Sequence, residues 1–120
     1  MPCATGEWYH CFNRGVDKRA VFIDERDYER FLMLLYASNG MEPVWISSKI
    51  SPRLENFLKD ESVDRGKPLV DVGVYALMPN HPHIVLKQIQ DNGIARFMQK
   101  VFTGYTMYFN LKYSRTGALF

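Results

Sequence analysis

His81 and His83 are the densest chemical signal in the sequence. In an extended strand, side chains two residues apart project from the same face, about 6.5–7 Å apart along the chain. Two imidazoles at that spacing can each direct a nitrogen lone pair at one divalent ion. Such an ion can polarise a phosphoryl oxygen and neutralise charge that develops in a transition state. Ordinary surface or core histidines also occur at this spacing, so the motif alone leaves both interpretations open.

Strand signals surround the histidine pair. Residues 69–78 are apolar and β-branched, as in a buried strand, and residues 81–87 form a second such run. Pro79 and Asn80 between them predict a turn, so the two runs should form an antiparallel hairpin. Residues 8–13 alternate bulky and polar side chains and predict another strand.

Two amphipathic helices are predicted before and after this hairpin. Asp24 is a suitable N-cap for a helix over residues 25–38, whose apolar residues recur at the spacing of one helical face. A longer helix is predicted over residues 93–112, with an apolar stripe that includes Tyr105 and Tyr108. The order strand, helix, strand pair, helix predicts an α+β fold: a ferredoxin-like antiparallel sheet with two helices packed on one face.

The chain of 120 residues is predicted to form one domain, residues 1–120. Residues 41–67 indicate an insertion or exposed connection, because prolines and a run of charges interrupt any periodic pattern. Within them, residues 44–46 could be a short strand and residues 54–58 a helical turn.

Composition limits the class of protein. Hydrophobic residues make up 47% of the chain and charged residues 23%, which is typical of a globular protein. No apolar run is long enough to cross a bilayer, and the first residues lack the pattern of a signal peptide. We therefore expect a cytoplasmic protein with no membrane partner. Cys3 and Cys11 are too few for a disulfide framework and are expected to be free and partly buried.

Positive charge is concentrated late in the sequence. Residues 87–120 contain five Lys and Arg against one acidic residue, whereas residues 1–86 contain 10 against 12. This distribution indicates a phosphate-binding surface, although a solvated helix face explains it equally well. The candidate phosphate contacts are Lys87, which shares strand parity with the histidines, Arg96 and Lys100 on one helix face beside the possible metal site, and Arg14 near a turn.

The sequence resembles a known family around these histidines. Its central motif resembles the signature strand pair of the single-tyrosine HUH transposases, most of all the REP-associated tyrosine transposases. The segment is Tyr75-Ala76-Leu77-Met78-Pro79-Asn80-His81-Pro82-His83-Ile84-Val85-Leu86. Residues 9–15 are similar to the first strand of that family, residues 24–31 to its first helix, and residues 93–100 and 105–110 to the helix after the histidines. The resemblance covers nearly all of the chain except residues 41–67.

This resemblance implies a metal-dependent enzyme that nicks and rejoins single-stranded DNA through a phosphotyrosine link. It makes His81 and His83 ligands of a divalent ion, Mg²⁺ or Mn²⁺, and imidazole ligands suit Mn²⁺ better. It also implies a homodimer and a single-stranded or hairpin DNA partner. The candidate DNA contacts are then the four basic residues Lys87, Arg96, Lys100 and Arg14. A phenol can act as both nucleophile and leaving group, so rejoining the strand requires no ATP.

Pro82 departs from the family pattern, which has a large apolar residue between the two histidines. Because proline lacks an N–H group, we expect this strand to lie at a sheet edge or to be bulged at Pro82. His10 on the first strand either faces the metal or is a structural, hydrogen-bonded histidine.

The family's catalytic tyrosine has an Asn or Gln four residues later as a third metal ligand. None of Tyr105, Tyr108 and Tyr113 has such a partner. Tyr105 and Tyr108 fit the core better than the role of nucleophile. We expect the nucleophile beyond Phe120 and a chain that is truncated before the catalytic helix and inactive alone. The alternative function is a non-catalytic relic that binds DNA hairpins.

Overall fold

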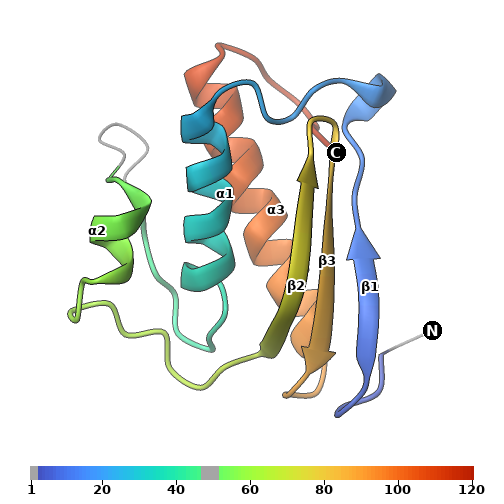
Figure 1. The fold of residues 1–120 in the computed structure, drawn as a ribbon, viewed down its shortest axis with the longest axis vertical. Coiled ribbons are helices and arrows are strands. Elements are labelled where there is room, and N and C mark those ends of the chain that lie inside the picture. The colour runs from blue at the N-terminus through green and yellow to red at the C-terminus, as the bar shows by residue number, and fades with distance from the viewer. Residues whose placement is uncertain (1–2, 47–51) are drawn as a thin grey trace.

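Two long helices lie on one face of a three-stranded antiparallel sheet (Figure 1). The computed structural model describes residues 3–46 and 52–120. In chain order the elements are β1 (Trp8–Phe12), the 3-10 helix η1 (Val16–Lys18), α1 (Glu25–Ala37), α2 (Leu54–Leu58), β2 (Val70–Met78), β3 (His81–Gln88) and α3 (Gly93–Lys112). The predicted α+β, ferredoxin-like fold is confirmed, because α1 and α3 both cover the same side of the sheet.

The strand order is β1-β3-β2, so the histidine strand is central. The expectation that Pro82 lies on an edge strand or at a bulge is therefore wrong: the register between β2 and β3 shifts only between Val72 and Val74. The physical reason is local. β1 ends at Phe12, opposite His83, so Pro82 lies one residue beyond it. In the alternating antiparallel ladder the nitrogen of Pro82 points to that unpaired side, and no ladder bond is lost.

Side chains of β3 alternate between the two faces of the sheet. Pro82, Ile84 and Leu86 are buried against the helices, whereas His81, His83 and Lys87 are half-buried on the opposite face. We call this second face the uncovered face, because no described helix packs on it. Its other members are Trp8, His10, Phe12, Asp71, Val74, Ala76, Met78 and Val85. The predicted shared face of Lys87 and the histidines is confirmed.

An aromatic core joins the helices to the sheet. Phe22, Phe31 and Tyr105 contact one another with ring centroids 5.3–5.4 Å apart. They pack against the buried strand residues Ile84 and Leu86. Truncating a phenylalanine in such a core typically costs about 3–5 kcal/mol. The prediction that Tyr105 and Tyr108 belong to the core is also confirmed, because they are only 0% and 6% exposed.

The N-terminus of α1 confirms the predicted cap. The Asp24 carboxylate accepts from the Asp27 backbone N–H at 3.1 Å, and the Asp27 carboxylate accepts in return from the Asp24 N–H at 3.3 Å. This reciprocal capping box satisfies donors that the first helical turn leaves unpaired. None of the helices in the described part of the chain is both long and apolar enough to cross a membrane.

Residues 41–46 and 52–67 lie in the connection between α1 and β2. The candidate helical turn is confirmed as α2, but residues 44–46 form no strand. Instead, Val44 and Ile46 pack against Phe57 in a small second cluster, and none of the three described strands pairs with them. Residues 47–51 of the predicted insertion lie outside the described residues. Cys3 and Cys11 are free and half-buried, as predicted.

Candidate metal and DNA site

The histidine pair lies at the start of β3, directly after the turn that joins it to β2. The rings of His81 and His83 lie side by side on the uncovered face, with centroids 4.5 Å apart and planes at 73°. Strand alternation places both rings there, and the helix-facing Pro82 between them is buried. The structure thus brings together the two residues that the sequence singled out as metal ligands.

His10 reaches the same place from β1. Its Nε2 atom lies 2.8 Å from Nδ1 of His83, and the two rings stack at 5.0 Å with planes 17° apart. The register explains the contact, because His10 is opposite Val85 and therefore diagonal to His83 on the same face. His10 is thus a hydrogen-bonded histidine that also belongs to the site.

Asn80 contacts the other histidine of the pair. Its side-chain oxygen Oδ1 lies 2.5 Å from Nδ1 of His81. The sequence predicted Asn80 as a turn residue but did not predict its contact with His81. The sequence feature that could have indicated the contact is the amide residue Asn80 in the two-residue turn, directly before His81 at the start of the next strand.

The turn itself is held by the segment that follows β1. The Gly15 N–H donates to the Asn80 carbonyl at 2.9 Å, and the Val21 and Phe22 N–H groups donate to the Pro79 carbonyl at 2.8 and 3.2 Å. A Cβ atom on Gly15 would lie 2.4 Å from the Arg19 carbonyl oxygen, so only glycine allows this close approach. Backbone hydrogen bonds from a distant segment therefore fix the position of the turn and of the histidines after it.

The electrostatics of the site favour neutral imidazole at His83. Desolvation lowers the pKa of His83 below its usual value, and the nearby His81, His10 and Arg14 lower it further. The neutral ring is the form that offers a lone pair to a metal ion. Arg14, a predicted DNA contact, lies near enough to contribute to this effect from the end of β1.

Exposed aromatic side chains flank the histidines. Phe12 is 58% exposed, and its ring lies 5.7 Å from that of His10 and 5.8 Å from that of His83. Trp8 is 51% exposed and lies over Gly73 of β2, where a Cβ atom would be only 2.7 Å from the indole ring. Neither residue was predicted to belong to the site, although both are large apolar residues that alternate along the predicted strand with the same parity as His10.

The four predicted DNA contacts separate into two groups. Lys87 is on the uncovered face, and Arg14 is close to the histidines. Arg96 and Lys100 are in the first turns of α3, which packs on the other face and begins beyond the opposite end of β3 (Figure 1). The expectation that they form a track beside the metal is therefore wrong. The Lys100 ammonium instead donates to the Gly40 carbonyl at 2.7 Å.

The C-terminal tyrosines all turn inward, away from the uncovered face. The Tyr105 hydroxyl donates to the Val21 carbonyl, and Tyr108 and Tyr113 donate to the Asp27 carboxylate at 2.7 and 2.6 Å. Burial raises the pKa of Tyr105, and it also raises those of Tyr108 and Tyr113 to about 12, with the nearby Asp27 adding to the effect. None of the residues that the three described strands place on the uncovered face is a tyrosine.

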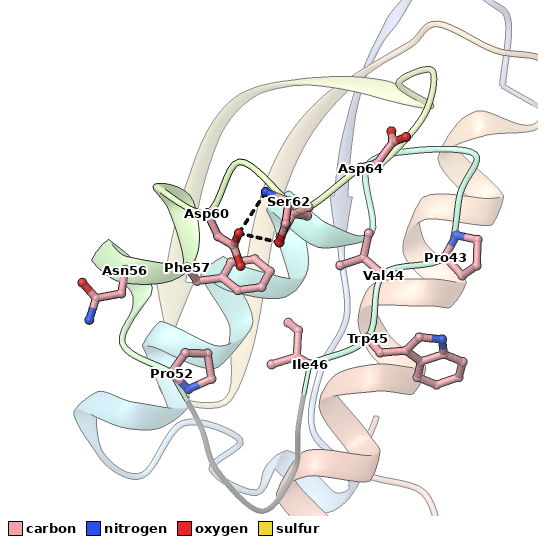
Figure 2. Close-up of a pocket in the computed structure, with 11 residues that line it drawn as sticks. Pro43, Val44, Trp45, Ile46, Pro52, Asn56, Phe57, Asp60, Ser62 and Asp64 are labelled. Atoms are coloured by element: carbon pink, nitrogen blue, oxygen red, sulfur yellow. Dashed lines mark hydrogen bonds between the residues drawn. The ribbon is translucent and has the colours of Figure 1, made fainter.

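A hollow between α2 and residues 43–46 lies on the helical side of the molecule, and Figure 2 shows its lining. Asp60 accepts from the backbone and hydroxyl of Ser62 at 2.9 and 2.6 Å, so its carboxylate is satisfied within its own loop. The indole of Trp45 borders a second hollow against α3 and is 88% exposed. Neither hollow includes a residue of the histidine site.

The two imidazoles supply two of the three protein ligands that the family resemblance implies, and nitrogen donors suit Mn²⁺ better than Mg²⁺, which prefers oxygen. Among residues 3–46 and 52–120, no group of three or more His, Cys, Asp and Glu side chains is arranged to hold a metal ion. Comparisons of the chain with protein-family models, curated proteins and solved structures give no match.

Proposed function

We propose that this chain is a single-stranded DNA-binding domain of the HUH transposase type, in which His81 and His83 bind a divalent metal ion, Mg²⁺ or Mn²⁺. The observation that carries the proposal is the pair of adjacent histidine rings on a sheet face that no described helix covers. The resemblance of residues 75–86 to the HUH strand pair supports the same conclusion. We also propose that the chain forms a homodimer, as the family resemblance implies.

The surroundings of the pair suit single-stranded nucleic acid. Trp8 and Phe12 offer exposed aromatic surface, and bases stack on such rings without regard to sequence. Only unpaired bases present a free face, so such a surface favours single strands over duplex. Lys87 lies about 13 Å along the strand from His83, at about 3.3 Å per residue, and can contact a phosphate farther along the same DNA strand.

A bound divalent ion would supply electrophilic activation of a phosphate. The residues of the chain have separate tasks. The His81 and His83 rings supply the nitrogen donors, the aromatic rings orient the DNA, and Lys87 with Arg14 attracts its backbone. Strand cleavage additionally requires a nucleophile, and the described uncovered face offers no tyrosine for it.

That last observation favours a second candidate function, a DNA-hairpin-binding domain without catalysis. The hydroxyl groups of Tyr105, Tyr108 and Tyr113 are all engaged in hydrogen bonds on the helical side of the sheet. The two functions share the DNA surface and differ only in covalent chemistry, so one assay separates them.

Titration of the protein with Mn²⁺ tests the metal site. We expect calorimetry to detect binding to the wild type and none to His83→Ala. Asp60→Ala is the control, because Asp60 is an exposed carboxylate remote from the histidines. Equal affinity of the wild type and His83→Ala would refute the metal assignment.

Incubation with end-labelled hairpin DNA and Mn²⁺, followed by native and denaturing electrophoresis, separates the two functions. A shifted band on the native gel supports a DNA-binding domain, and its absence refutes both candidates. An adduct that survives denaturation establishes covalent transposase chemistry. A native shift without an adduct favours the hairpin-binding function of this chain.

A further inference from the structure

The contact between Asn80 and His81 determines which nitrogen of His81 carries a proton. Oδ1 of Asn80 is a carbonyl oxygen and can only accept a hydrogen bond. With Oδ1 of Asn80 2.5 Å from Nδ1 of His81, this contact is a hydrogen bond when the His81 ring carries its proton on Nδ1. A neutral ring with a proton on Nδ1 has its lone pair on Nε2. Free histidine side chains favour the opposite tautomer, so Asn80 holds His81 in a form that it would not otherwise prefer.

His83 has a corresponding partner in His10. Its Nδ1 atom is engaged with Nε2 of His10 at 2.8 Å. If His83 donates this bond from Nδ1, its Nε2 atom likewise has a free lone pair. Each histidine of the pair thus has its Nδ1 atom bound by a different neighbour, one in the turn and one on β1. Metal-binding histidines characteristically use their second ring nitrogen for a hydrogen bond of this kind.

Both partners are anchored independently of the histidines. The Asn80 carbonyl accepts from the Gly15 N–H, and the preceding Pro79 carbonyl accepts from Val21 and Phe22. His10 is fixed by the pairing of β1 with β3, in which residue 10 faces Val85. These backbone contacts fix where the two partner residues lie relative to the histidine strand.

We propose that Asn80 and His10 are positioning residues that set the tautomers of His81 and His83 and leave the Nε2 atom of each ring available to a shared divalent ion. The metal-binding part of this inference rests on the function proposed above. The inferred effect of Asn80 on the His81 tautomer does not, because it depends only on the contact between Oδ1 of Asn80 and Nδ1 of His81.

Nitrogen-15 NMR of the imidazole rings in the metal-free protein tests the tautomer directly. At a pH where the rings are neutral, we expect His81 to carry its proton on Nδ1 in the wild type. Asn80→Ala should shift His81 toward the Nε2–H form, whereas Asn80→Asp retains an acceptor and should preserve the Nδ1–H form. Asn80 does not adopt a positive φ, so alanine fits the turn. An unchanged His81 tautomer in Asn80→Ala would overturn the role of Asn80.

Calorimetry with Mn²⁺ tests the consequence for binding. Loss of a hydrogen-bonding neighbour of a metal ligand typically weakens affinity about 10–100-fold, and we expect this from both Asn80→Ala and His10→Ala. His10→Gln retains an acceptor near Nδ1 of His83 and should restore most of the affinity. If His10→Ala abolishes binding as completely as His83→Ala and glutamine does not restore it, His10 is a ligand and its positioning role is overturned.

The two measurements distinguish failure of this inference from failure of the proposed function. A wild-type protein that holds the Nδ1–H tautomer but binds no Mn²⁺ overturns the metal site and, with it, the metal-directed part of the inference. If the wild type and Asn80→Ala bind Mn²⁺ with equal affinity, only the positioning role of Asn80 is overturned. Thermal unfolding of each variant confirms that the fold is retained.

Discussion

Replacing the two exposed aromatic residues of the uncovered face with leucine should weaken the binding of single-stranded DNA. Trp8 and Phe12 project from β1 on either side of His10 and are each about half exposed, at 51% and 58%. Leucine keeps an apolar side chain at both positions but has no ring face on which a base can stack. The substitution therefore removes stacking while it retains much of the apolar character of the strand.

The size of the effect follows from this exposure. Base–aromatic stacking contributes about 1–3 kcal/mol per base. Since only about half of each ring is accessible, we take the lower part of this range, about 1–1.5 kcal/mol per ring. Each 1.4 kcal/mol changes a dissociation constant about tenfold. Each single variant should bind about 5–15-fold more weakly, and the double variant about 30–150-fold more weakly if the rings act independently.

Fluorescence anisotropy with a labelled oligothymidine, at one fixed salt concentration, measures this change. Trp45→Leu is a matched control, because Trp45 is 88% exposed but borders α3 on the helical side. It should leave affinity unchanged. The Trp8 ring also rests on Gly73, so the thermal midpoint of each variant is measured in parallel. A folded double variant with wild-type affinity, or an equal loss in Trp45→Leu, would refute the stacking surface.

Two further predictions use charged residues. The logarithm of the affinity for single-stranded DNA falls linearly with the logarithm of the salt concentration, and Lys87→Ala should make this slope shallower by about 0.7. Arg96→Ala is the control and should leave the slope unchanged. Equal slopes in the wild type and Lys87→Ala would exclude a phosphate contact at Lys87. Asp27→Asn should lower the free energy of unfolding at pH 7 by about 2–3 kcal/mol, because it breaks the ion pair between Asp27 and Lys112. This value is below the typical cost of breaking a buried ion pair, since Lys112 is partly exposed and also binds Asp24. Denaturant titrations at several pH values check this, and a constant difference between wild type and variant down to acid pH would refute it.

The sign of that pH dependence follows from the surroundings of Asp27. Burial is the largest influence and by itself would raise the pKa of Asp27, but hydrogen bonds from Lys112, Tyr113, the Ile23 N–H and Tyr108 hold it below its usual value. A carboxyl whose pKa is lower in the folded state stabilises the fold above its unfolded pKa of about 3.9. This contribution is lost as the pH falls through the lowered folded pKa. The wild-type and Asp27→Asn curves should therefore converge in acid, below about pH 4.

Local periodicity was enough to predict most elements of the fold. The helix after Asp24 was predictable because its cap and its apolar spacing agree, and the hairpin because two apolar runs flank Pro79 and Asn80. Strand parity alone also predicted that Lys87 lies on the same face as the histidines. These are properties of neighbouring residues, which a sequence displays directly.

The errors concern contacts between distant parts of the chain. The central position of β3 depends on β1 pairing with it across more than 70 residues, so a proline within that strand misleadingly indicated an edge. The face on which Arg96 and Lys100 lie depends on how α3 packs, which charge spacing does not reveal. The His10–His83 contact likewise requires the register of β1 against β3. Such information is tertiary, and no local pattern contains it.

The position of Tyr105 connects the core to the candidate site. Its place on the apolar stripe of α3 predicted a core residue, and its hydroxyl donates to the Val21 carbonyl inside the core. The N–H of the same Val21 residue donates to the Pro79 carbonyl, in the turn that contains Asn80 and precedes His81. These hydrogen bonds therefore link α3, through Val21, to the turn that precedes the histidine pair. Because the aromatic core fixes α3 and the Val21 segment, packing on the helical face of the sheet holds in place the turn from which the histidine pair follows on the uncovered face.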